Sequence, residues 1–456
     1  MALAMLMMFS FFFASHATSA DFVRCLSASI PNQLLFTQSS PSFASVLASS
    51  VRNPRFLTPA TVRPLCIVTA TNASHVQATV VCGRRHDVRL RVRSAGHDYE
   101  GLSYRSARAD AAPFAVVDLA GLRSVRVTRG TPATAWVDSG ATLGELYYAI
   151  AKVSDRLAFP AGLCPTVGVG GHLSGGGFGM LMRRHGLAAD QVVVIVDALL
   201  VNAEGQILDS NAMGRDVFWA IRGGGGGGSF GIVLSWRVNL VAVPPKVTAF
   251  SVSKSVQDCV VDIITKWQQV APALRDDLLI RVVAHGQSAT FQSLYLGTCD
   301  ALLSVMNSSA TVDDILKRTL PGDSVFSKAT SDYVRQAISR DTWAQIFTSC
   351  AGEETAPMGW VRDVYTFMQP QVSKNPREAY ANYRDLWLGE NVVGGNVTSF
   401  EAGRVWGEKY YKGNFRRLAT AKAQIDPSDY FRHEQSIPPL GNQLISTIVA
   451  REDHTD

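Results

Sequence analysis

A glycine-rich stretch from Ala161 to Asp190, AGLCPTVGVGGHLSGGGFGMLMRRHGLAAD, constrains the fold of this chain more than any other segment. Its glycine density is too high for the interior of an ordinary helix or strand. Glycines let the main chain approach a bulky ligand closely, with backbone N–H groups free to face phosphates. The glycines assigned to such contacts are Gly168, Gly170, Gly171, Gly175, Gly176, Gly177 and Gly179. The stretch therefore predicts a large anionic cofactor.

Two common nucleotide-binding patterns do not fit this stretch. The dinucleotide fingerprint G-x-G-x-x-G, started at Gly168, needs a glycine at its sixth position, where the chain has Leu173. A phosphate loop needs Gly-Lys followed by Ser or Thr, which is also missing from the sequence. The simpler alternative is a glycine-rich surface loop around a buried cysteine. A second motif further upstream weighs against that alternative.

The second motif is the turn RSAGHDY at residues 93–99, which offers a histidine ring beside main chain that can approach a ligand. Asp98 is available to influence the charge of the His97 ring. A single turn histidine is more often structural than reactive. However, a neutral imidazole and a thiolate both add to electrophilic rings at neutral pH, and Cys164 supplies the second group. The pair is therefore more informative than either residue alone.

The length of the chain and its N-terminal targeting segment are consistent with a secreted globular protein. The chain has 456 residues, 47% hydrophobic and 18% charged, which allows two domains with sizeable cores. An apolar run at 2–14 and the small residues ATSA at 17–20 predict a signal peptide, residues 1–20, cleaved after Ala20. No later apolar segment is long enough to span a bilayer. The net charge of +5 indicates a mildly cationic surface and does not identify a partner.

Cysteines and glycosylation sequons fit the same compartment. The odd number of cysteines leaves at least one free or chemically modified. The seven are Cys25, Cys66, Cys82, Cys164, Cys259, Cys299 and Cys350. The predicted glycosylation sites are Asn72, Asn307 and Asn396.

Hydrophobic periodicity predicts an α/β or α+β chain with short turns. Strands are expected at 66–70, within 89–106, at 114–122, 124–128 and 134–141, in a hairpin at 191–210, and at 277–284 and 290–297. Helices are expected at 74–85, 142–154 and 256–272 and beyond Phe400. Composition shifts at Val243-Pro244-Pro245, which predicts a domain boundary. A second candidate site is the hydrolase pattern G-x-S-x-G at 227–231, with Ser229 as nucleophile, although the glycine run at 223–228 satisfies such patterns by composition.

Four motifs together resemble the plant berberine bridge enzyme-like, FAD-linked oxidases. They are RSAGHDYEGLSYRS, CPTVGVGGHLSGGGFGMLMRRHGLAADQVV, FWAIRGGGG with SFGIVLSW, and YFRHEQSIPPL, and the likeness runs from about Asp21 to Leu440. The resemblance implies the α+β fold of the vanillyl-alcohol oxidase group. Residues 21–243 would form a PCMH-type FAD-binding domain of two α/β subdomains, to which residues 400–456 return. Residues 244–399 would form a shortened substrate domain, with an antiparallel sheet covered by helices.

The resemblance also implies FAD held by two covalent bonds. His97 would bond the 8α-methyl carbon and Cys164 would bond C6 of the isoalloxazine ring, which agrees with the odd cysteine count. A disulfide would join Cys25 to Cys82. Two tethers would raise the flavin potential and so favour alcohol oxidation. Further cofactor contacts are assigned to Arg93, Ser94, Ala95, Gly96, Asp98, Val167, His172, Val192 and Asn414.

The chemistry that the resemblance implies is proton removal from the substrate, hydride transfer to flavin N5 and reoxidation by O2 to hydrogen peroxide. Val167 stands at the family's oxygen gate, where valine resembles oxidases and leucine resembles dehydrogenases. The tyrosines of AYANYRDLWLG that match catalytic ones are Tyr380 and Tyr383. A phenol acts as a base only if its pKa is lowered, which a nearby cation can do.

The sequence departs from the family pattern in two segments of the expected substrate domain. The chain has only MNSSATV between Val305 and Asp313, where relatives carry a longer segment. It also has AGEETAPMG after Cys350, where relatives carry a hairpin and an E-x-x-x-P-F-P-H-R motif that holds a catalytic residue. Glu353 and Glu354 lie beside this gap, although such a pair is more often surface charge.

The sequence therefore predicts a secreted FAD-dependent oxidase of the extracellular space or plant cell wall. Its substrate would be a small-molecule alcohol, either an oligosaccharide or other carbohydrate or an aromatic alcohol, with O2 as acceptor. No metal, nucleic acid or membrane partner is expected. The first alternative is a non-catalytic or impaired flavoprotein from a truncated gene model. The second is a serine hydrolase that uses Ser229.

Overall fold

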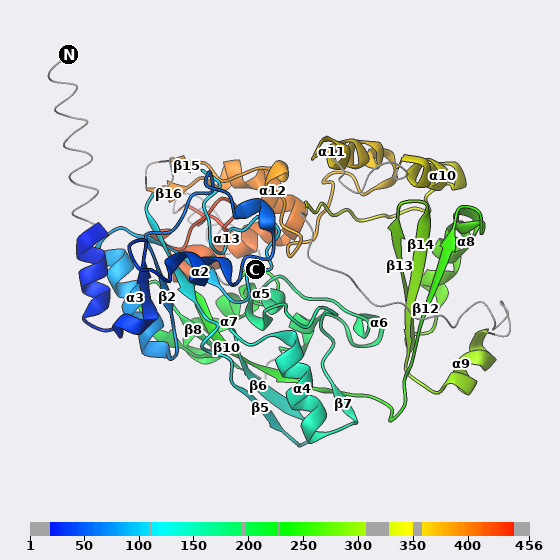
Figure 1. The fold of residues 1–456 in the computed structure, drawn as a ribbon, viewed down its shortest axis with the longest axis horizontal. Helices are drawn as coiled ribbons and strands as arrows, with labels where there is room; N and C mark the ends of the chain where they lie inside the picture. The colour runs from blue at the N-terminus through cyan, green and yellow to red at the C-terminus, as the bar shows by residue number, and fades with distance from the viewer. Residues whose placement is uncertain are drawn as a thin grey trace, which may run out of the picture.

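The computed structural model describes residues 19–108, 112–192, 197–226, 228–306, 328–349, 358–394 and 396–441. Figure 1 shows two parts side by side. The larger part contains both the N-terminal segment and the helices from the far end of the chain. The smaller part contains strands β12 to β14 and the helices around them. Most of the predicted signal peptide, residues 1–18, lies outside the described residues.

The first sheet of the larger part has the strand order β1-β2-β4-β3. Strands β2, β3 and β4 are parallel to one another, and β1 is antiparallel to β2. Their bounds are Leu35–Thr37 for β1, Cys66–Thr69 for β2, Arg89–Arg93 for β3 and Phe114–Asp118 for β4. The continuous apolar runs of β2 and β4 are nearly all buried, as expected of parallel strands covered on both faces.

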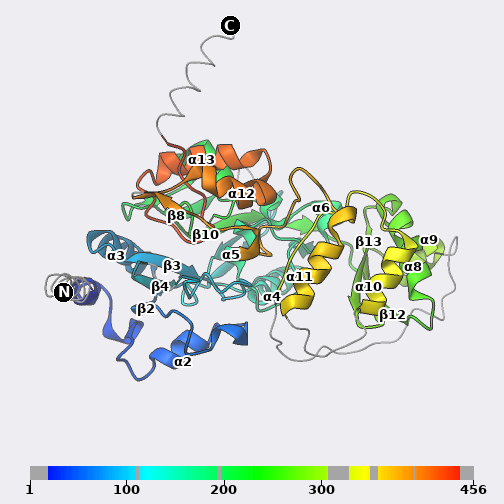
Figure 2. The same ribbon diagram turned by 90° about the horizontal axis from the view of Figure 1, so that it is seen from above.

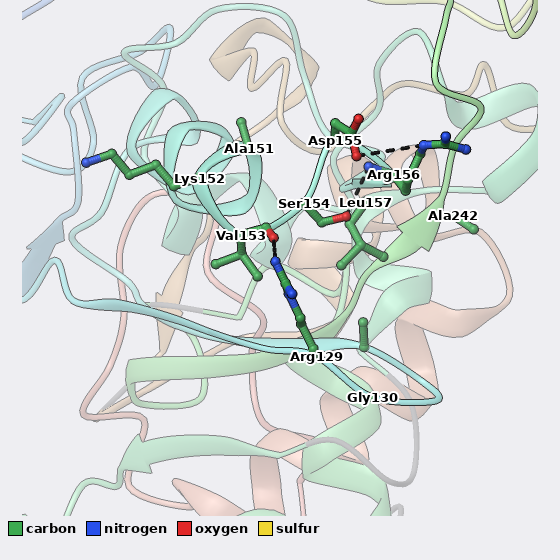
Figure 3. Close-up of a pocket in the computed structure, with 11 residues that line it drawn as sticks. Arg129, Gly130, Ala151, Lys152, Val153, Ser154, Asp155, Arg156, Leu157 and Ala242 are labelled. Atoms are coloured by element: carbon green, nitrogen blue, oxygen red, sulfur yellow. Dashed lines mark hydrogen bonds and ion pairs between the residues drawn. The ribbon is translucent and has the colours of Figure 1, made fainter.

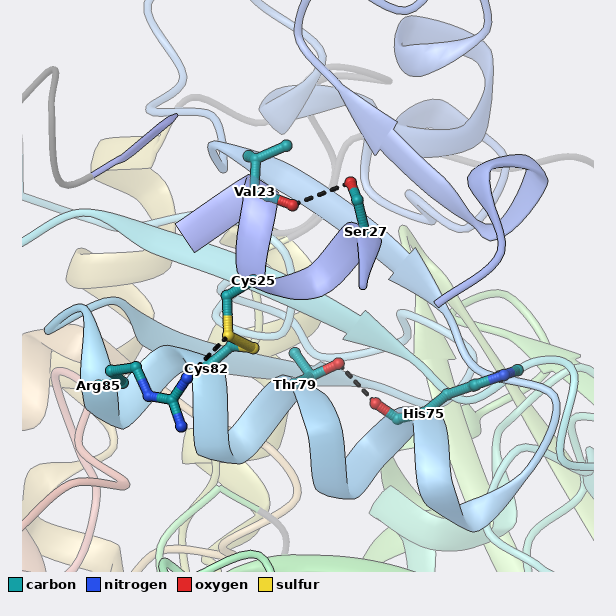
Figure 4. The surroundings of a disulfide bond; sticks show 7 residues. All are labelled: Val23, Cys25, Ser27, His75, Thr79, Cys82 and Arg85. Atoms are coloured by element: carbon teal, nitrogen blue, oxygen red, sulfur yellow. Dashed lines mark hydrogen bonds between the residues drawn. A yellow bond between two sulfur atoms is a disulfide. The ribbon is translucent and has the colours of Figure 1, made fainter. Parts of the chain in front are cut away.

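Helix α3, Ala73–Arg85, connects β2 to β3 and begins where an asparagine can cap it. The Asn72 side chain accepts a hydrogen bond from the His75 N–H at 3.1 Å. The predicted disulfide between Cys25 and Cys82 is confirmed. It joins the first helix, residues 19–27, to α3, with the two Cα atoms 5.8 Å apart (Figure 4).

The second sheet is antiparallel and has the order β5-β6-β10-β8-β9. Its bounds are Val125–Thr128 for β5, Thr134–Asp138 for β6, Ala198–Val201 for β8, Ile207–Leu208 for β9 and Ile232–Asn239 for β10. The predicted hairpin at 191–210 is present as β8 and β9, which are shorter than expected. A small sheet pairs β7, Leu157–Ala158, with β11, Val241–Ala242.

Helices from distant parts of the chain cover this second sheet. They are α4, Leu143–Val153; α5, Val169–Ser174; α7, Ser210–Ala220; α12, Phe400–Tyr411; and α13, Asn414–Ile425. Helix α6, Met182–His185, lies apart from this sheet, and its Arg183 donates to the carbonyls of Ala271 and Arg275. Helix α13 packs against α7, and both contribute to the largest apolar core. The fully buried Lys422 ammonium in α13 donates to the carbonyl of Ser229 at 2.6 Å and pairs with Asp426. The C-terminal helices are therefore part of this core.

The smaller part is built on a three-stranded antiparallel sheet of order β12-β14-β13 (Figure 2). The bounds are Thr248–Ser255 for β12, Leu278–His285 for β13 and Ser288–Tyr295 for β14. Its helices are α8, Val260–Val270; α9, Cys299–Met306; α10, Arg340–Ser349; and α11, Met358–Phe367. Helix α8 begins four residues later than predicted because Ser255 and Asp258 form a hydrogen-bonded turn.

One face of the three-stranded sheet is apolar. Phe291 of β14 packs there with Ile264 of α8 and Phe347 of α10. The cross-strand neighbours Arg281 and Gln292 lie on the opposite face, because side chains alternate along each strand. Strand β13, which carries Arg281, is an edge strand of this sheet.

Two further elements complete the described fold. Helix α2, Phe43–Ala48, packs near β1 and β2, and a short hairpin joins β15, Val393–Gly394, to β16, Val397–Thr398. The sequon asparagine Asn396 is exposed in that hairpin, and Asn72 is exposed at the start of α3. Asn307 lies outside the described residues.

The cysteines outside the disulfide remain unpaired wherever the structure describes them. Cys66, Cys259 and Cys299 are free, as is Cys164. Burial raises the pKa of the Cys66 thiol to about 12. Cys350 lies among the residues that are not described.

Candidate functional site

A cavity of about 490 Å³ lies where the two predicted motifs meet the three-stranded sheet. The turn after β3 and the loop before α5 form one side of it. Strand β13 and the loop before α12 supply the other residues. Of the predicted site residues, the cavity is lined by Ser94, Ala95, Gly96, His97, Asp98, Cys164, Val167, Gly168, Gly170, Gly171, His172, Gly179, Tyr380 and Tyr383.

His97 and Cys164 both contact one hydroxyl group at the edge of this cavity. The His97 Nε2 atom is 2.9 Å from Thr166 Oγ1, and the Cys164 Sγ atom is 3.3 Å from the same oxygen. Gly96, with φ of +68°, makes the turn that directs His97, since a Cβ there would lie 1.8 Å from the Ser50 carbonyl oxygen. Two turns that are distant in the sequence therefore bring an imidazole and a thiol together.

The charge on His97 is controlled by a different neighbour from the one predicted. Burial, together with the positive charge of Arg52, lowers the pKa of His97 to about 4, so the ring is neutral at pH 7. Asp98 does not act on the ring. Its carboxylate accepts hydrogen bonds from the N–H groups of Leu102 and Ser103 and from the Ser103 hydroxyl.

The glycines of the central stretch have two different functions. At Gly171 a Cβ atom would meet nothing within 4 Å, so this position opens into the cavity. At Gly175 a Cβ would lie 1.9 Å from Asn382 Oδ1, and at Gly177 it would lie 2.5 Å from the His172 ring. Gly175, Gly176 and Gly177 are not among the lining residues. Several glycines thus allow protein to pack against protein, which the prediction of ligand contacts did not anticipate.

Three further predicted cofactor residues, besides these glycines, lie apart from the cavity lining. The Arg93 guanidinium is fully buried, where it pairs with Asp118 and donates to the carbonyls of Val46 and Leu47. Val192 is fully buried in the main core. Asn414 is exposed at the first residue of α13. The Arg93 side chain is therefore committed to the fold, and its carbonyl oxygen accepts a hydrogen bond from the Leu119 N–H at 2.8 Å.

The two candidate catalytic tyrosines lie in an aromatic cluster with Phe178 and Tyr99. Tyr380 and Tyr383 have ring centroids 5.2 Å apart, and the Tyr99 ring is 5.4 Å from that of Tyr383. The Tyr380 hydroxyl oxygen accepts from the Gly177 N–H at 2.9 Å and from the Asn382 amide at 3.1 Å.

Neither candidate tyrosine has a lowered pKa. Burial raises the pKa of Tyr380 to about 12. Burial also raises the pKa of Tyr383, although the positive charge of Arg281 opposes that rise. The Arg281 side chain lines the same cavity and is held by two hydrogen bonds to Gln292 Oε1 across the sheet. Tyr383 is therefore the phenol whose anion a neighbouring cation stabilises.

His172 lines the cavity as a second neutral histidine. Its Nε2 atom accepts a hydrogen bond from the Gly162 N–H at 3.0 Å, and burial lowers the pKa of the ring to about 4. The bond to Gly162 assigns the ring proton to Nδ1.

Ser229 lacks the geometry of a nucleophile. It is only 1% exposed, and its hydroxyl accepts a hydrogen bond from the Ile437 N–H at 3.2 Å. A nucleophile elbow instead presents an exposed hydroxyl to a base. The hydrolase alternative therefore has no support in this geometry.

A larger surface hollow of about 730 Å³ lies beyond the C-terminal end of α4 (Figure 3). Its cations are already engaged, because Arg129 donates to the Val153 carbonyl and Arg156 pairs with Asp155. Lys152 points away from the hollow in Figure 3, toward the Tyr148 ring. No histidine, cysteine or tyrosine lines it, so we do not consider it the site.

A buried ion-pair cluster holds the two sides of the site together. The Lys328 ammonium pairs with Glu100, three residues after His97, and at 2.5 Å with Asp385, two residues after Tyr383. All three side chains are 2% exposed, and the ammonium also lies 4.4 Å from the centre of the Trp387 ring. This cluster fixes the histidine turn relative to the tyrosine loop.

Replacing Lys328 by methionine should lower the free energy of unfolding by about 3–5 kcal/mol, because Asp385 would remain buried without its cation and Glu100 would keep only Arg105, 3.6 Å away. Denaturant unfolding of the purified protein measures the change. The matched control is Arg404→Ala, since Arg404 is half exposed and pairs with Glu401 and Glu408 on one helix face. That control should lower the free energy of unfolding by less than about 1 kcal/mol. Equal losses in the two variants would contradict a special role for the cluster.

Sequence reasoning missed Thr166, Asn382 and Arg281. Thr166 and Asn382 stand inside quoted motifs, so their spacing from Cys164 and Tyr380 was a usable signal. Arg281 carries no local signal, because its position depends on the pairing of β13 with β14. Glu353 and Glu354 lie outside the described residues.

The residues present fit an FAD group. Gly171 opens into a cavity that is lined by the central glycine-rich stretch and by the RSAGHDY turn. The side chains of His97 and Cys164 meet at the edge of this cavity. Within the residues that the structure describes, no cluster of three or more potential metal ligands occurs. Among the described helices, none has the length and apolar character needed to cross a membrane.

Comparison with known proteins agrees with this fit. Residues 64–211 match the family model described as FAD binding domain, and residues 379–438 match the one described as berberine and berberine like. Berberine bridge enzyme-like Cyn d 4 of Cynodon dactylon is 50% identical over 493 residues, covering 92% of this chain and 93% of that protein. Berberine bridge enzyme-like 8 of Arabidopsis thaliana is 39% identical over 94% of this chain and 96% of its own length.

Solved structures show the same fold. The Bermuda grass isoallergen BG60 is 49% identical and superimposes with a TM-score of 0.86 over 92% of this chain and all of its own. Wild-type Phl p 4.0202, described as a glucose dehydrogenase, is 46% identical with a TM-score of 0.85 over the same shares. A Phl p 4 variant with isoleucine changed to valine is described as a glucose oxidase. A second, with asparagine changed to histidine, is a glucose dehydrogenase, and the variant with both changes is a glucose oxidase.

The fold and the site define an FAD-binding oxidoreductase with the PCMH-type arrangement of helices and sheets. More particularly, this chain belongs to the berberine bridge enzyme-like family.

Proposed function

We propose that this protein is a secreted FAD-linked oxidase that oxidises a hydroxyl group of a carbohydrate, such as glucose or an oligosaccharide, or of an aromatic alcohol, and passes the electrons to O2 to form H2O2. The supporting observation is that Val167 and His172 both line the cavity. The two changes in the paired Phl p 4 oxidase variant also introduce valine and histidine five positions apart. In those proteins, valine accompanies oxidase activity and histidine alone does not.

The chain's own side chains have distinct roles in this proposal. Bound FAD would supply the ring that accepts the hydride. Tyr383 takes the proton from the substrate hydroxyl, and Arg281 stabilises the resulting phenolate. Tyr380 keeps its proton and orients the substrate. The aromatic cluster around these tyrosines excludes water from the reacting groups.

The finer features of the site belong to the same proposal. His97 and Cys164 attach the flavin covalently, and the turns at 94–98 and 167–172 contact the cofactor together with the main chain of Arg93, Val192 and Asn414. Residues 21–243 and 400–456 form the cofactor domain, and residues 244–399 form the substrate domain. The proposal also includes cleavage of the signal peptide after Ala20 and glycosylation at Asn72, Asn307 and Asn396. The mature protein would reside in the extracellular space or the cell wall.

Anaerobic mixing of purified protein with glucose, cellobiose and an aromatic alcohol tests the reaction. The absorbance of oxidised flavin should fall on mixing with at least one of them. Admission of O2 should then restore it with one H2O2 formed per flavin. An absorbance that no alcohol or sugar changes would reject the oxidase proposal.

Substituting isoleucine for Val167 should slow reoxidation of the flavin by O2 about 10- to 100-fold, because an added methylene in a packed site costs roughly 1–3 kcal/mol. The rate of reduction by sugar should stay the same, since the change affects access of O2 alone. Stopped-flow absorbance measures both steps. Val92→Ile adds the same methylene elsewhere in the cavity lining and should leave the O2 reaction unchanged. Slower reduction with normal reoxidation would be the contrary result.

A flavoprotein with impaired turnover is the second candidate. The match to Cyn d 4 extends over 493 positions, more than the 456 residues of this chain, so that relative carries residues that this chain lacks. This candidate predicts yellow protein whose flavin no substrate reduces.

A further inference from the structure

Thr166 lies between the two side chains that would hold the flavin. Its hydroxyl is within hydrogen-bond distance of His97 Nε2 at 2.9 Å and near Cys164 Sγ at 3.3 Å. The main chain of Thr166 also hydrogen-bonds the His97 ring. One exposed hydroxyl therefore connects both predicted attachment points.

The number of protons available limits which atoms donate and which accept in the contact between His97, Thr166 and Cys164. A threonine hydroxyl has one proton to donate and lone pairs to accept with. The His97 ring is neutral and so carries one proton, because burial and Arg52 lower its pKa to about 4. If Nε2 holds that proton and donates it to Thr166, the hydroxyl can donate its own proton to the Cys164 sulfur. Nδ1 then keeps a free lone pair.

We propose that Thr166 is the positioning residue for flavin attachment: it holds His97 in the tautomer whose Nδ1 is nucleophilic, and it stabilises the thiolate of Cys164. A neutral imidazole with a free lone pair and a thiolate are the reactive forms of the two groups. This inference rests on the double attachment in the proposed function.

The attachment steps balance with O2 as the oxidant. The His97 bond replaces one hydrogen of the ring methyl group, and the imidazole loses its proton. The Cys164 bond replaces the hydrogen on C6, and the thiol loses its proton. Each new bond transfers two electrons through the flavin to one O2, which takes up the two released hydrogens as H2O2.

Full-length Thr166→Val and Thr166→Ser variants test the proposal by flavin retention. The purified proteins are denatured in acid, and flavin that stays with the polypeptide is separated from flavin released into solution. Thr166→Val should retain about ten-fold less covalent flavin than the natural protein after equal exposure to FAD and air. Thr166→Ser, which keeps the hydroxyl, should restore most of it. Total flavin before denaturation should be equal in all three, which shows that the cavity has folded.

Variants that keep only one attachment residue separate the effect of Thr166 on His97 from its effect on Cys164. Thr166→Val should reduce attachment through the cysteine in a His97→Ala protein and through the histidine in a Cys164→Ala protein. Full retention in Thr166→Val, or failure of serine to restore attachment, would overturn the role of Thr166 alone. A natural protein that releases all its flavin would instead overturn the double attachment and this inference with it.

Discussion

Replacement of Tyr383 by phenylalanine is expected to slow reduction of the flavin by sugar about a hundred- to ten-thousand-fold, the usual contribution of a general base. Flavin content should not change, because the ring and its contacts with Tyr99 and Tyr380 remain. Anaerobic stopped-flow absorbance measures the reduction rate. Tyr380→Phe is the matched control and should slow reduction of the flavin only about ten-fold. The Tyr380 oxygen already accepts two hydrogen bonds and is a poor base.

The pH dependence of this rate provides an independent check. Tyr383 can accept a proton only when ionised, and burial raises its pKa, so the reduction rate should increase as pH rises above neutrality. Arg281→Met removes the cation that opposes this rise in pKa. The increase should therefore move to higher pH in that variant. A profile that Arg281→Met does not shift would exclude Tyr383 as the base.

Replacement of Gly171 by leucine should lower the flavin bound per polypeptide at least about ten-fold, because filling a packed binding site with an extra side chain costs several kcal/mol. The leucine would enter the cavity, where a Cβ meets no protein atom within 4 Å. The flavin-free fold should persist, since Gly171 lies in helix α5, where leucine is favourable. The ratio of flavin to protein absorbance measures binding, and circular dichroism measures the fold.

Gly359→Leu serves as the control for this experiment. Gly359 is an exposed glycine in helix α11, and a Cβ there also meets nothing within 4 Å. This control should keep its full flavin content. Normal flavin content in Gly171→Leu would show that the cofactor does not occupy the cavity.

Local sequence patterns predicted those parts of the fold that depend on local interactions. The apolar runs of β2 and β4 and the capped helix α3 appear within a few residues of their expected bounds. The pairing of Cys25 with Cys82 came from the family resemblance and not from spacing. Helix α8 was predicted too early because a side-chain turn at Ser255 overrides its apolar periodicity.

The site was less predictable wherever distant segments determine its properties. His97 and Cys164 have distinctive motifs, and the structure brings both to one cavity. The pKa of His97 depends instead on burial and on Arg52. The pKa of Tyr383 depends on burial and on Arg281, which lies in strand β13 of the smaller part. The glycines at 175–177 also show that a composition signal cannot separate contact with a ligand from contact with protein.

The position of helix α13 has a consequence for biosynthesis. This helix packs against α7 in the main core, and its Lys422 holds the segment around Ser229, yet it is among the last described elements of the chain. During translation, those apolar faces therefore stay exposed until nearly the whole polypeptide has left the ribosome.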